Sequence, residues 1–258
     1  MNRINRLFSE KKNNILSLYF CAGHPTIDSA PHIIETLARG GIDMIEVGIP
    51  FSDPMADGPV IQDAATKALR NGMTLSRLFD QLSDIRQRGI DVPIILMGYL
   101  NPIMQFGFEE CCRRAAECGV DGFIIPDLPF KDYMRDFRPV SDRYDLRIIM
   151  LITPETEDER IRFIDDHTDG FIYMVSAAAT TGAQRSFDQA KQDYFRRIDA
   201  MNLRNPRMIG FGISNRQTLT SAMANASGAI IGSKFVTLLD QTGTPEEALR
   251  LLRAALEQ

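Results

Sequence analysis

The sequence predicts an α/β fold: a single (β/α)8 (TIM) barrel with an N-terminal extra helix. Short runs of Ile, Leu, Val, Met and Phe recur along the 258 residues, and longer amphipathic segments lie between them. Near-continuous apolar runs are typical of strands covered on both faces, and their alternation with helices requires parallel strands with crossover connections. Eight such runs in a chain of this length fit a closed barrel better than an open sheet.

The expected strands follow the apolar runs in chain order. They are Ile15–Cys21, Met44–Val47, Pro93–Met97, Gly122–Ile125, Leu146–Ile152, Gly170–Val175, Arg207–Phe211 and Ala229–Ile231. After the first run the chain reads Ala22-Gly23-His24-Pro25, which is not the G-x-G-x-x-G turn of a dinucleotide-binding sheet. No linker or abrupt change of composition divides the chain, so residues 1–258 are expected to form one domain.

The clearest helical patterns lie between these runs. They are Ser29–Arg39, Leu75–Arg88, Phe108–Cys118, Glu155–Asp166 and Pro245–Leu256. The first three carry apolar residues at helical spacing and end directly before a glycine, as helix C-caps do. The last has a proline in its first turn, where a helix tolerates it.

The composition argues against several functions. With 29 basic and 34 acidic residues the net charge is -5, so a nucleic-acid-binding surface is not expected. No apolar stretch approaches the roughly 18 residues of a membrane span, and the N-terminus does not resemble a secretory signal. The cysteines (Cys21, Cys111, Cys112 and Cys118) form no C-x-x-C pair, and the three histidines are far apart. We therefore expect no metal site, and buried, reduced thiols in a cytoplasmic protein.

Glu46 is the first candidate for chemistry, because barrel active sites lie at the C-terminal ends of the strands. It lies inside an apolar run that continues Val47-Gly48. A carboxyl group in a low-dielectric site has a raised pKa, which suits proton transfer near neutral pH. The alternative is a structural acid paired with a neighbouring arginine.

The loop after this strand, Ser52–Pro59, is rich in Pro, Asp and Gly and contains Asp53 and Asp57. Acids that face Glu46 from this loop would form a pair of carboxylates in different environments. Such a pair supplies one group that moves a proton and one fixed negative charge. The alternative is a simple turn, but the spacing favours a functional loop.

Glycine-containing loops follow the last three expected strands. They are Thr181-Gly182-Ala183, Gly210–Ser214 and Gly232-Ser233-Lys234. Backbone N–H groups of such loops, with a helix N-terminus behind them, bind anions, and barrels often place a phosphate after strands seven and eight. Glycines that only permit tight turns are the alternative, and three such loops on one rim favour phosphate.

Other polar residues make weaker candidates. His24 precedes a proline and is interpreted as part of a turn, and Cys111 and Cys112 as helix packing. Lys234 lacks the frame of a P-loop lysine. None of the six lysines falls in an expected strand, which argues against a Schiff-base aldolase.

The segment Ile45–Gln62, IEVGIPFSDPMADGPVIQ, closely resembles the signature of the tryptophan synthase alpha chain family. The similarity continues in order along the whole chain, through Asn101-Pro102, Asp127-Leu128-Pro129, Tyr173–Gly182 and the last two glycine loops. The first motif is highly specific, whereas the glycine loops alone would not identify the family. The resemblance implies retro-aldol cleavage of indole-3-glycerol phosphate to indole and glyceraldehyde 3-phosphate. This carbon–carbon lyase step belongs to the last steps of L-tryptophan biosynthesis and needs no metal or organic cofactor.

The resemblance also implies catalytic roles for three residues. Glu46 matches the family's catalytic glutamate, which could protonate carbon 3 of the indole and deprotonate the adjacent glycerol hydroxyl in turn. Asp57 matches the loop aspartate and would accept the indole N–H, stabilising positive charge that develops on the ring. Tyr173 matches a tyrosine near the reacting hydroxyl, where orienting is expected rather than proton transfer.

Binding residues are implied in the same way. The phosphate is expected on N–H groups near Gly182, Gly212, Gly232 and Ser233. Tyr19, Met97, Tyr99 and Phe211 match positions that wall the indole, although core packing accounts equally well for any one of them. Thr181 could hydrogen-bond Asp57 when the loop closes.

The chain departs from the family at two places. Residues 176–180 read Ser-Ala-Ala-Ala-Thr, where members commonly have an Arg and a Gly-Val, so the closed lid is expected to be held less tightly. Phe130-Lys131 follows Asp127-Leu128-Pro129, where small or acidic residues are usual, near the expected partner surface.

The resemblance implies a partner, the tryptophan synthase beta chain, in an alpha2-beta2 heterotetramer under allosteric control. That beta chain is a pyridoxal-phosphate enzyme that receives indole through a tunnel. Pyridoxal phosphate is expected only on the beta partner, so this chain carries no cofactor. Phe51–Gly58 and the Asn101-Pro102 segment would form the interface.

Two alternative functions remain open at this stage. One is a catalytically weak subunit that mainly activates its partner, which the retained Glu46 and Asp57 argue against. The other is a different phosphate-binding barrel, an isomerase or aldolase acting on sugar phosphates without an indole, which the loop signature disfavours.

Overall fold

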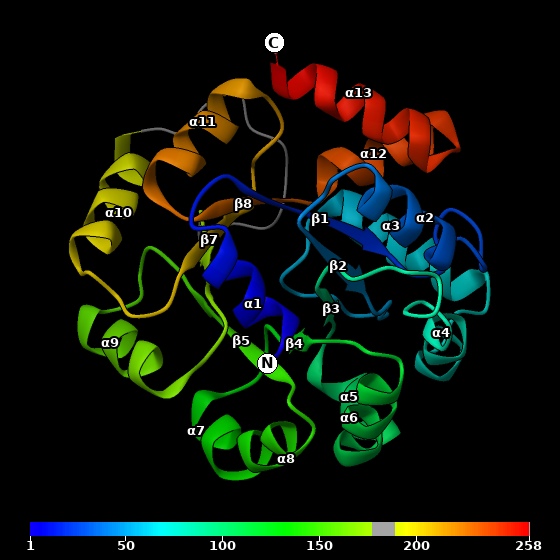
Figure 1. Cartoon of the computed structure of the whole chain (residues 1–258), viewed down its shortest axis with the longest axis horizontal. Helices are drawn as coiled ribbons and strands as arrows, with labels where there is room; N and C mark the ends of the chain where they lie inside the picture. Colours follow the sequence, from blue (N-terminus) through cyan, green and yellow to red (C-terminus); the bar gives the residue numbers. More distant parts are fainter. Residues whose placement is uncertain (177–188, 258) are drawn as a thin grey trace.

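The eight strands form one closed parallel barrel in the computed structural model, which describes residues 1–176 and 189–257 (Figure 1). The strands are β1 (Ile15–Cys21), β2 (Met44–Gly48), β3 (Ile94–Met97), β4 (Gly122–Ile124), β5 (Arg147–Ile152), β6 (Ile172–Val175), β7 (Arg207–Gly210) and β8 (Gly228–Ile231). Each strand pairs with the next, and β8 closes the barrel against β1. The predicted barrel is therefore confirmed, whereas the single domain over 1–258 stays a prediction.

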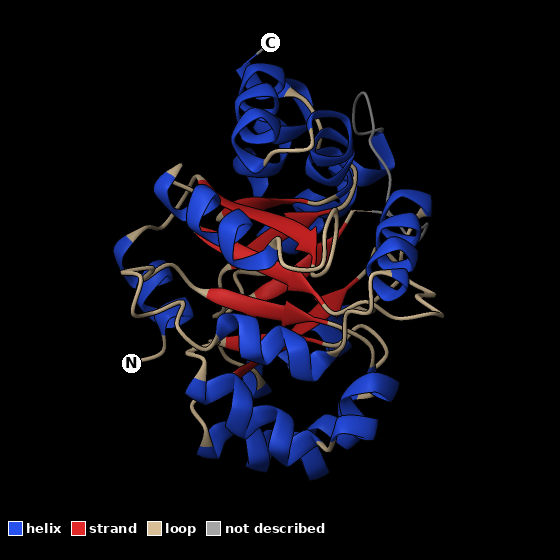
Figure 2. Cartoon of the chain, turned by 90° about the vertical axis from the view of Figure 1, so that its right-hand side faces the viewer, coloured by secondary structure: helices blue, strands red, loops and turns tan. Residues whose placement is uncertain are grey.

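Helices cover the outside of the barrel (Figure 2). They are α1 (Arg3–Glu10), α2 (Ala30–Arg39), α3 (Pro59–Arg70), α4 (Leu75–Leu82), α5 (Leu100–Phe106), α6 (Phe108–Glu117), α7 (Phe130–Asp132), the π-helix η1 (Tyr133–Phe137), α8 (Arg138–Arg143), α9 (Asp158–His167), α10 (Gln189–Ala200), α11 (Arg216–Asn225), α12 (Ser233–Thr242) and α13 (Pro245–Glu257). Every residue of β2, β3, β4, β6 and β8 is buried. Burial on both faces explains why these strands are near-continuous apolar runs.

The N-terminal helix α1 lies across the N-terminal end of the barrel, which confirms the predicted extra helix (Figure 1). Asn2 caps it, because its side-chain oxygen accepts the N–H of Ile4 at 2.9 Å. The amide of Asn2 also donates to the carbonyl oxygens of Asp121 at 2.8 Å and of Asp145 at 2.6 Å. This end of the barrel is thus closed, and the opposite end is left for a site.

Some element boundaries differ from the prediction. Helix α4 ends at Leu82 rather than Arg88, because the hydroxyl and the N–H of Ser83 both bond the Asp80 carbonyl and form a turn. Helix α9 begins at Asp158 rather than Glu155, because a turn closed by the Thr156 hydroxyl precedes it. The other strand and helix ends agree with the prediction to within two residues.

The remaining predictions at this level concern the thiols and membrane spans. All four cysteines are free and buried, as predicted. Within residues 1–176 and 189–257, no helix is long and apolar enough to cross a membrane.

Candidate active site

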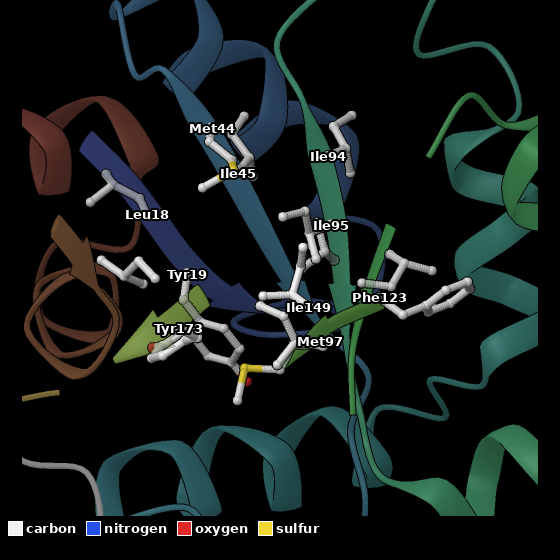
Figure 3. Close-up of a cluster of buried hydrophobic side chains, with 14 of the residues drawn as sticks. Leu18, Tyr19, Met44, Ile45, Ile94, Ile95, Met97, Phe123, Ile149 and Tyr173 are labelled. Atoms are coloured by element: carbon white, nitrogen blue, oxygen red, sulfur yellow. The ribbon is translucent and has the colours of Figure 1, made fainter. Parts of the chain in front are cut away.

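A cavity opens at the C-terminal ends of the strands. It is lined by Tyr19, Glu46, Asp57, Ile61, Met97, Tyr173, Phe211, Gly212, Ile213, Ile230, Gly232, Ser233 and Lys234. Figure 3 shows that the side chains of Tyr19, Met97 and Tyr173 point toward one another inside the barrel. The residues come from strands far apart in the chain, which only the closed barrel brings together.

Glu46 lies on the inner face of β2 and is completely buried. The Ser17 hydroxyl donates to its Oε1 at 3.0 Å, and its Oε2 has no hydrogen-bond partner in the described part of the chain. Burial raises the pKa of Glu46 to about 8, although the hydrogen bond from Ser17 opposes the rise. Glu46 forms no salt bridge with any described residue, so the reading as a structural acid paired with an arginine is not supported. A carboxyl group with this pKa can give and take a proton near neutral pH.

Asp57 lies in the loop between β2 and α3 and is 7% exposed. Its Oδ2 accepts the hydroxyl of Tyr99 at 2.8 Å, while that hydroxyl accepts the N–H of Ala56 at 3.0 Å. Burial raises the pKa of Asp57 to about 6, against the lowering effect of the Tyr99 hydrogen bond. The predicted pair of carboxylates in different environments is therefore present, with Asp57 the more acidic.

Two tyrosines reach the cavity because glycines lie beneath them. A Cβ atom on Gly48 would come within 2.1 Å of the Tyr19 hydroxyl oxygen, and one on Gly210 within 2.2 Å of the Tyr173 hydroxyl oxygen. Any larger residue at either glycine would displace the ring. Burial raises the pKa of Tyr173 well above its usual value, so this hydroxyl stays protonated and suits orientation more than proton transfer.

Phe211 turns the chain out of β7. Its φ is +70°, a left-handed conformation that is unusual for a bulky residue, which is why β7 ends at Gly210 rather than at Phe211 as predicted. The Ser176 hydroxyl donates to the Phe211 carbonyl at 2.6 Å, and the ring meets Tyr173 edge-on at 6.0 Å between centroids. The strained backbone thus points an aromatic ring into the cavity.

The rim of the cavity carries the glycine loops. Gly212 follows Phe211, and Gly232 and Ser233 precede and begin α12. The free N–H groups of the first turn of a helix and the positive end of its dipole favour an anion. Thr181 and Gly182, predicted to complete this rim, lie outside the described residues.

The structure gathers nine predicted site residues around one cavity. They are Glu46, Asp57, Tyr173, Tyr19, Met97, Phe211, Gly212, Gly232 and Ser233. Tyr99 instead lies behind Asp57, where its ring contacts Phe51 at 5.5 Å between centroids. Its role as an indole wall stays a prediction.

Some residues at the cavity were not singled out by the sequence. The apolar wall of the cavity also includes Ile61, Ile213 and Ile230. The rim includes Lys234, which lacks the sequence frame of a P-loop lysine. Ser17 was missed altogether, although a serine inside an apolar strand, two residues before Tyr19, was a signal that it shares the inner face.

The other polar candidates lie away from this cavity or serve packing. His24 forms the predicted turn through its N–H to the Cys21 carbonyl, and its buried ring also meets Asp240 at 2.9 Å. Cys111 and Cys112 are buried in α6, as predicted. Among the described residues, no group of three or more His, Cys, Asp or Glu could hold a metal ion.

The fold and the site define a class: a (β/α)8-barrel protein with two buried carboxylates and a glycine-lined rim in one cavity at the C-terminal ends of the strands. A family model described as "Tryptophan synthase alpha chain" matches residues 5–257. The chain belongs to the tryptophan synthase alpha chain family, whose members cleave indole-3-glycerol phosphate in tryptophan biosynthesis.

Similar proteins support this assignment over the full length. The chain is 66% identical over 258 residues to the tryptophan synthase alpha chain of Phocaeicola vulgatus, covering 100% of both chains. It is 64% identical to that of Bacteroides fragilis, covering 99% of this chain and 97% of the relative. The crystal structure of the alpha chain from Legionella pneumophila matches with a TM-score of 0.87 and 30% identity, covering 100% of this chain and 98% of that one. A tryptophan synthase structure from M. tuberculosis, in an aminoacrylate-bound form, matches with a TM-score of 0.84 and 27% identity, covering 99% and 98%.

Proposed function

We propose that this chain is a carbon–carbon lyase subunit in which Glu46 and Asp57 cleave indole-3-glycerol phosphate. The observation that carries the proposal is a fully buried glutamate that lines the same cavity as a second carboxylate and has one oxygen without a hydrogen-bond partner among the described residues. Protonated Glu46 gives its proton to carbon 3 of the indole. The resulting carboxylate then takes the proton of the glycerol hydroxyl, and the carbon–carbon bond breaks to leave indole and glyceraldehyde 3-phosphate.

Asp57 stabilises the charge that this protonation creates. Its carboxylate accepts the indole N–H, so positive charge on the ring develops opposite a fixed negative charge in a site of low dielectric. With a pKa of about 6, Asp57 is ionised near neutral pH while Glu46, at about 8, is still protonated. The two carboxyl groups therefore hold the two protonation states that the reaction needs at the same pH.

The remaining residues bind and orient the substrate. Tyr173 positions the reacting hydroxyl, and Tyr19, Met97 and Phe211 provide flat apolar contact for the indole ring. The phosphate is proposed to accept hydrogen bonds from the backbone N–H groups of Gly212, after β7, and of Gly232 and Ser233, at the start of α12.

The proposal extends to a partner. We expect a beta chain that carries the pyridoxal phosphate and receives indole, with a stoichiometry of two alpha and two beta chains. The side chain of Met55, in the expected interface loop Phe51–Gly58, is exposed, and so is that of Met104, two residues beyond Asn101-Pro102 in α5. A cytoplasmic location stays a prediction.

The test is release of indole from indole-3-glycerol phosphate by the purified chain, with and without a beta chain. Slow release alone and faster release with the partner would support a lyase under allosteric control, and no release in either case would contradict the proposal. Glu46→Gln should lower the rate by about 10³-fold or more while substrate still binds. Retained turnover in this variant would remove Glu46 from the mechanism.

A further inference from the structure

Ser17 places a hydroxyl in the interior of an otherwise apolar strand. It lies in β1, is fully buried, and its Oγ donates to Oε1 of Glu46 at 3.0 Å. A buried hydroxyl is costly unless it is hydrogen-bonded, and the hydrogen bond recorded for this one goes to the central carboxyl group of the site.

The barrel register explains how the two residues meet. Tyr19 of β1 pairs with Glu46 of β2, and Ser17 pairs with Met44. Side chains two residues apart on a strand lie on the same face, so Ser17 points into the barrel as Tyr19 does. The Glu46 side chain therefore bonds not the residue paired with it, Tyr19, but the preceding inward-facing residue of β1, Ser17.

The hydrogen bond makes the two carboxyl oxygens of Glu46 unequal. Oε1 is held by Ser17, whereas Oε2 is buried without a hydrogen-bond partner among the described residues. A group that gives a proton to one substrate atom and takes one from another must present a defined oxygen at a defined place, because misplacement weakens proton transfer.

We propose that Ser17 is a positioning residue for Glu46: it fixes Oε1 so that Oε2 is the oxygen that carries the proton to and from the substrate. This inference rests on the proposed acid–base role of Glu46. Ser17 itself does not line the cavity, so it acts through Glu46 rather than on the substrate.

The same contact also affects the pKa of Glu46. Burial raises the pKa of Glu46, and the hydrogen bond from Ser17 lowers it. The donated hydrogen bond stabilises the carboxylate more than the neutral acid. Without it the pKa rises further, and the carboxylate becomes harder to form.

The experiment compares Ser17→Ala with Ser17→Thr, which keeps the hydroxyl, and with Ser141→Ala as a matched control. Ser141 is also buried, but its hydroxyl bonds the Arg138 carbonyl within α8. Indole release by the complex with the beta chain is measured as kcat/KM against pH. Activity falls as pH rises through the pKa of the protonated Glu46, so the alkaline limb reports this group.

We expect the alkaline limb of Ser17→Ala to move upward by about one pH unit, the size expected for loss of one hydrogen bond to a carboxylate. Its kcat should fall roughly 10-fold, because Oε2 is no longer held in place. Ser17→Thr and Ser141→Ala should keep the wild-type limb. The pKa of Glu46 can also be measured by infrared titration of its carboxylic acid C=O band, which is assigned by its loss in Glu46→Gln. This measurement does not depend on turnover, and it does not require that the threonine of Ser17→Thr pack well.

A Ser17→Ala variant whose alkaline limb and infrared titration both coincide with those of Ser141→Ala would overturn the inference, whatever its rate. Failure of the proposed function looks different, because Glu46→Gln would then retain turnover. If Glu46→Gln is inactive and Ser17→Ala is unshifted, the lyase mechanism stands and only the role of Ser17 is lost.

Discussion

Each end of the barrel buries a carboxyl group, but the two groups differ in how many hydrogen-bond donors and cations surround them. At the N-terminal end, Asp121 is 2% exposed and accepts hydrogen bonds from Arg3 at 3.1 Å, from Arg86 at 2.8 Å and from the N–H of Ile94 at 2.9 Å. At the C-terminal end, Glu46 is completely buried with one hydroxyl donor and no cation among the described residues.

The difference separates structure from chemistry. Burial raises the pKa of Asp121 as well, but Arg86, Arg3 and the N–H of Ile94 oppose the rise. These donors stabilise the carboxylate, which joins α1, the segment after α4 and the start of β4. A carboxyl group left without such donors is costly to ionise, so its proton is available near neutral pH. Left-handed backbone occurs at both ends. Asn14 and Asp145 adopt it just before β1 and β5, but Asn and Asp tolerate this conformation, whereas the bulky Phe211 adopts it after β7.

The largest effect on stability should come from removing Asp121, the carboxylate with many donors at the N-terminal end. Asp121→Ala leaves the partly buried Arg86 without its counter-charge and the buried N–H of Ile94 without its acceptor. We expect a loss of about 3–5 kcal/mol in the free energy of unfolding, measured by urea denaturation. The kcat of the folded protein should stay unchanged. Asp84→Ala, which removes an exposed ion pair with Arg88, is the control and should leave stability nearly unchanged. Loss of turnover in a stable Asp121→Ala variant would break the comparison.

A smaller effect on stability should come from Glu46 at the C-terminal end, and this effect should depend on pH. The pKa of Glu46 rises from 4.5 to about 8 on folding, so its contribution is fully present below pH 4.5 and is lost as pH rises through 8. Glu46→Gln cannot titrate. Its free energy of unfolding relative to wild type should therefore increase between pH 5 and pH 8.5, by on the order of 3 kcal/mol. A difference that stays constant with pH would show that Glu46 is not buried as a neutral acid.

The smallest effect concerns the second carboxylate of the site. Asp57→Asn keeps the size of the side chain but removes the fixed negative charge, and we expect kcat/KM for indole release to fall roughly 10²-fold. Tyr99→Phe removes the hydrogen bond to Asp57 and the acceptor of the Ala56 N–H but keeps the charge, so it should cost less, roughly 10-fold. Equal losses in the two variants would mean that the loop geometry matters and the charge does not.

Much of the fold and part of the site could be predicted from the sequence. The alternation of apolar runs and amphipathic segments predicts the barrel because burial on both faces leaves a local trace in each strand. Glu46 stands out because a carboxylate inside an apolar run breaks that local pattern, and Asp57 because its loop is rich in Pro, Asp and Gly. Helix ends were less predictable, as at Ser83 and Thr156, since side-chain hydrogen bonds to nearby backbone decide them.

Sequence by itself determined the barrel, the family signature and the two carboxylates, because each depends on residues close together in the chain. Only the tertiary structure decided what those carboxylates touch. Tyr99 lies behind Asp57, Ser17 holds one oxygen of Glu46, and no described cation reaches the other. These contacts join residues 29 and 42 positions apart, and they depend on the register of the closed barrel and on the side chains that fill its interior.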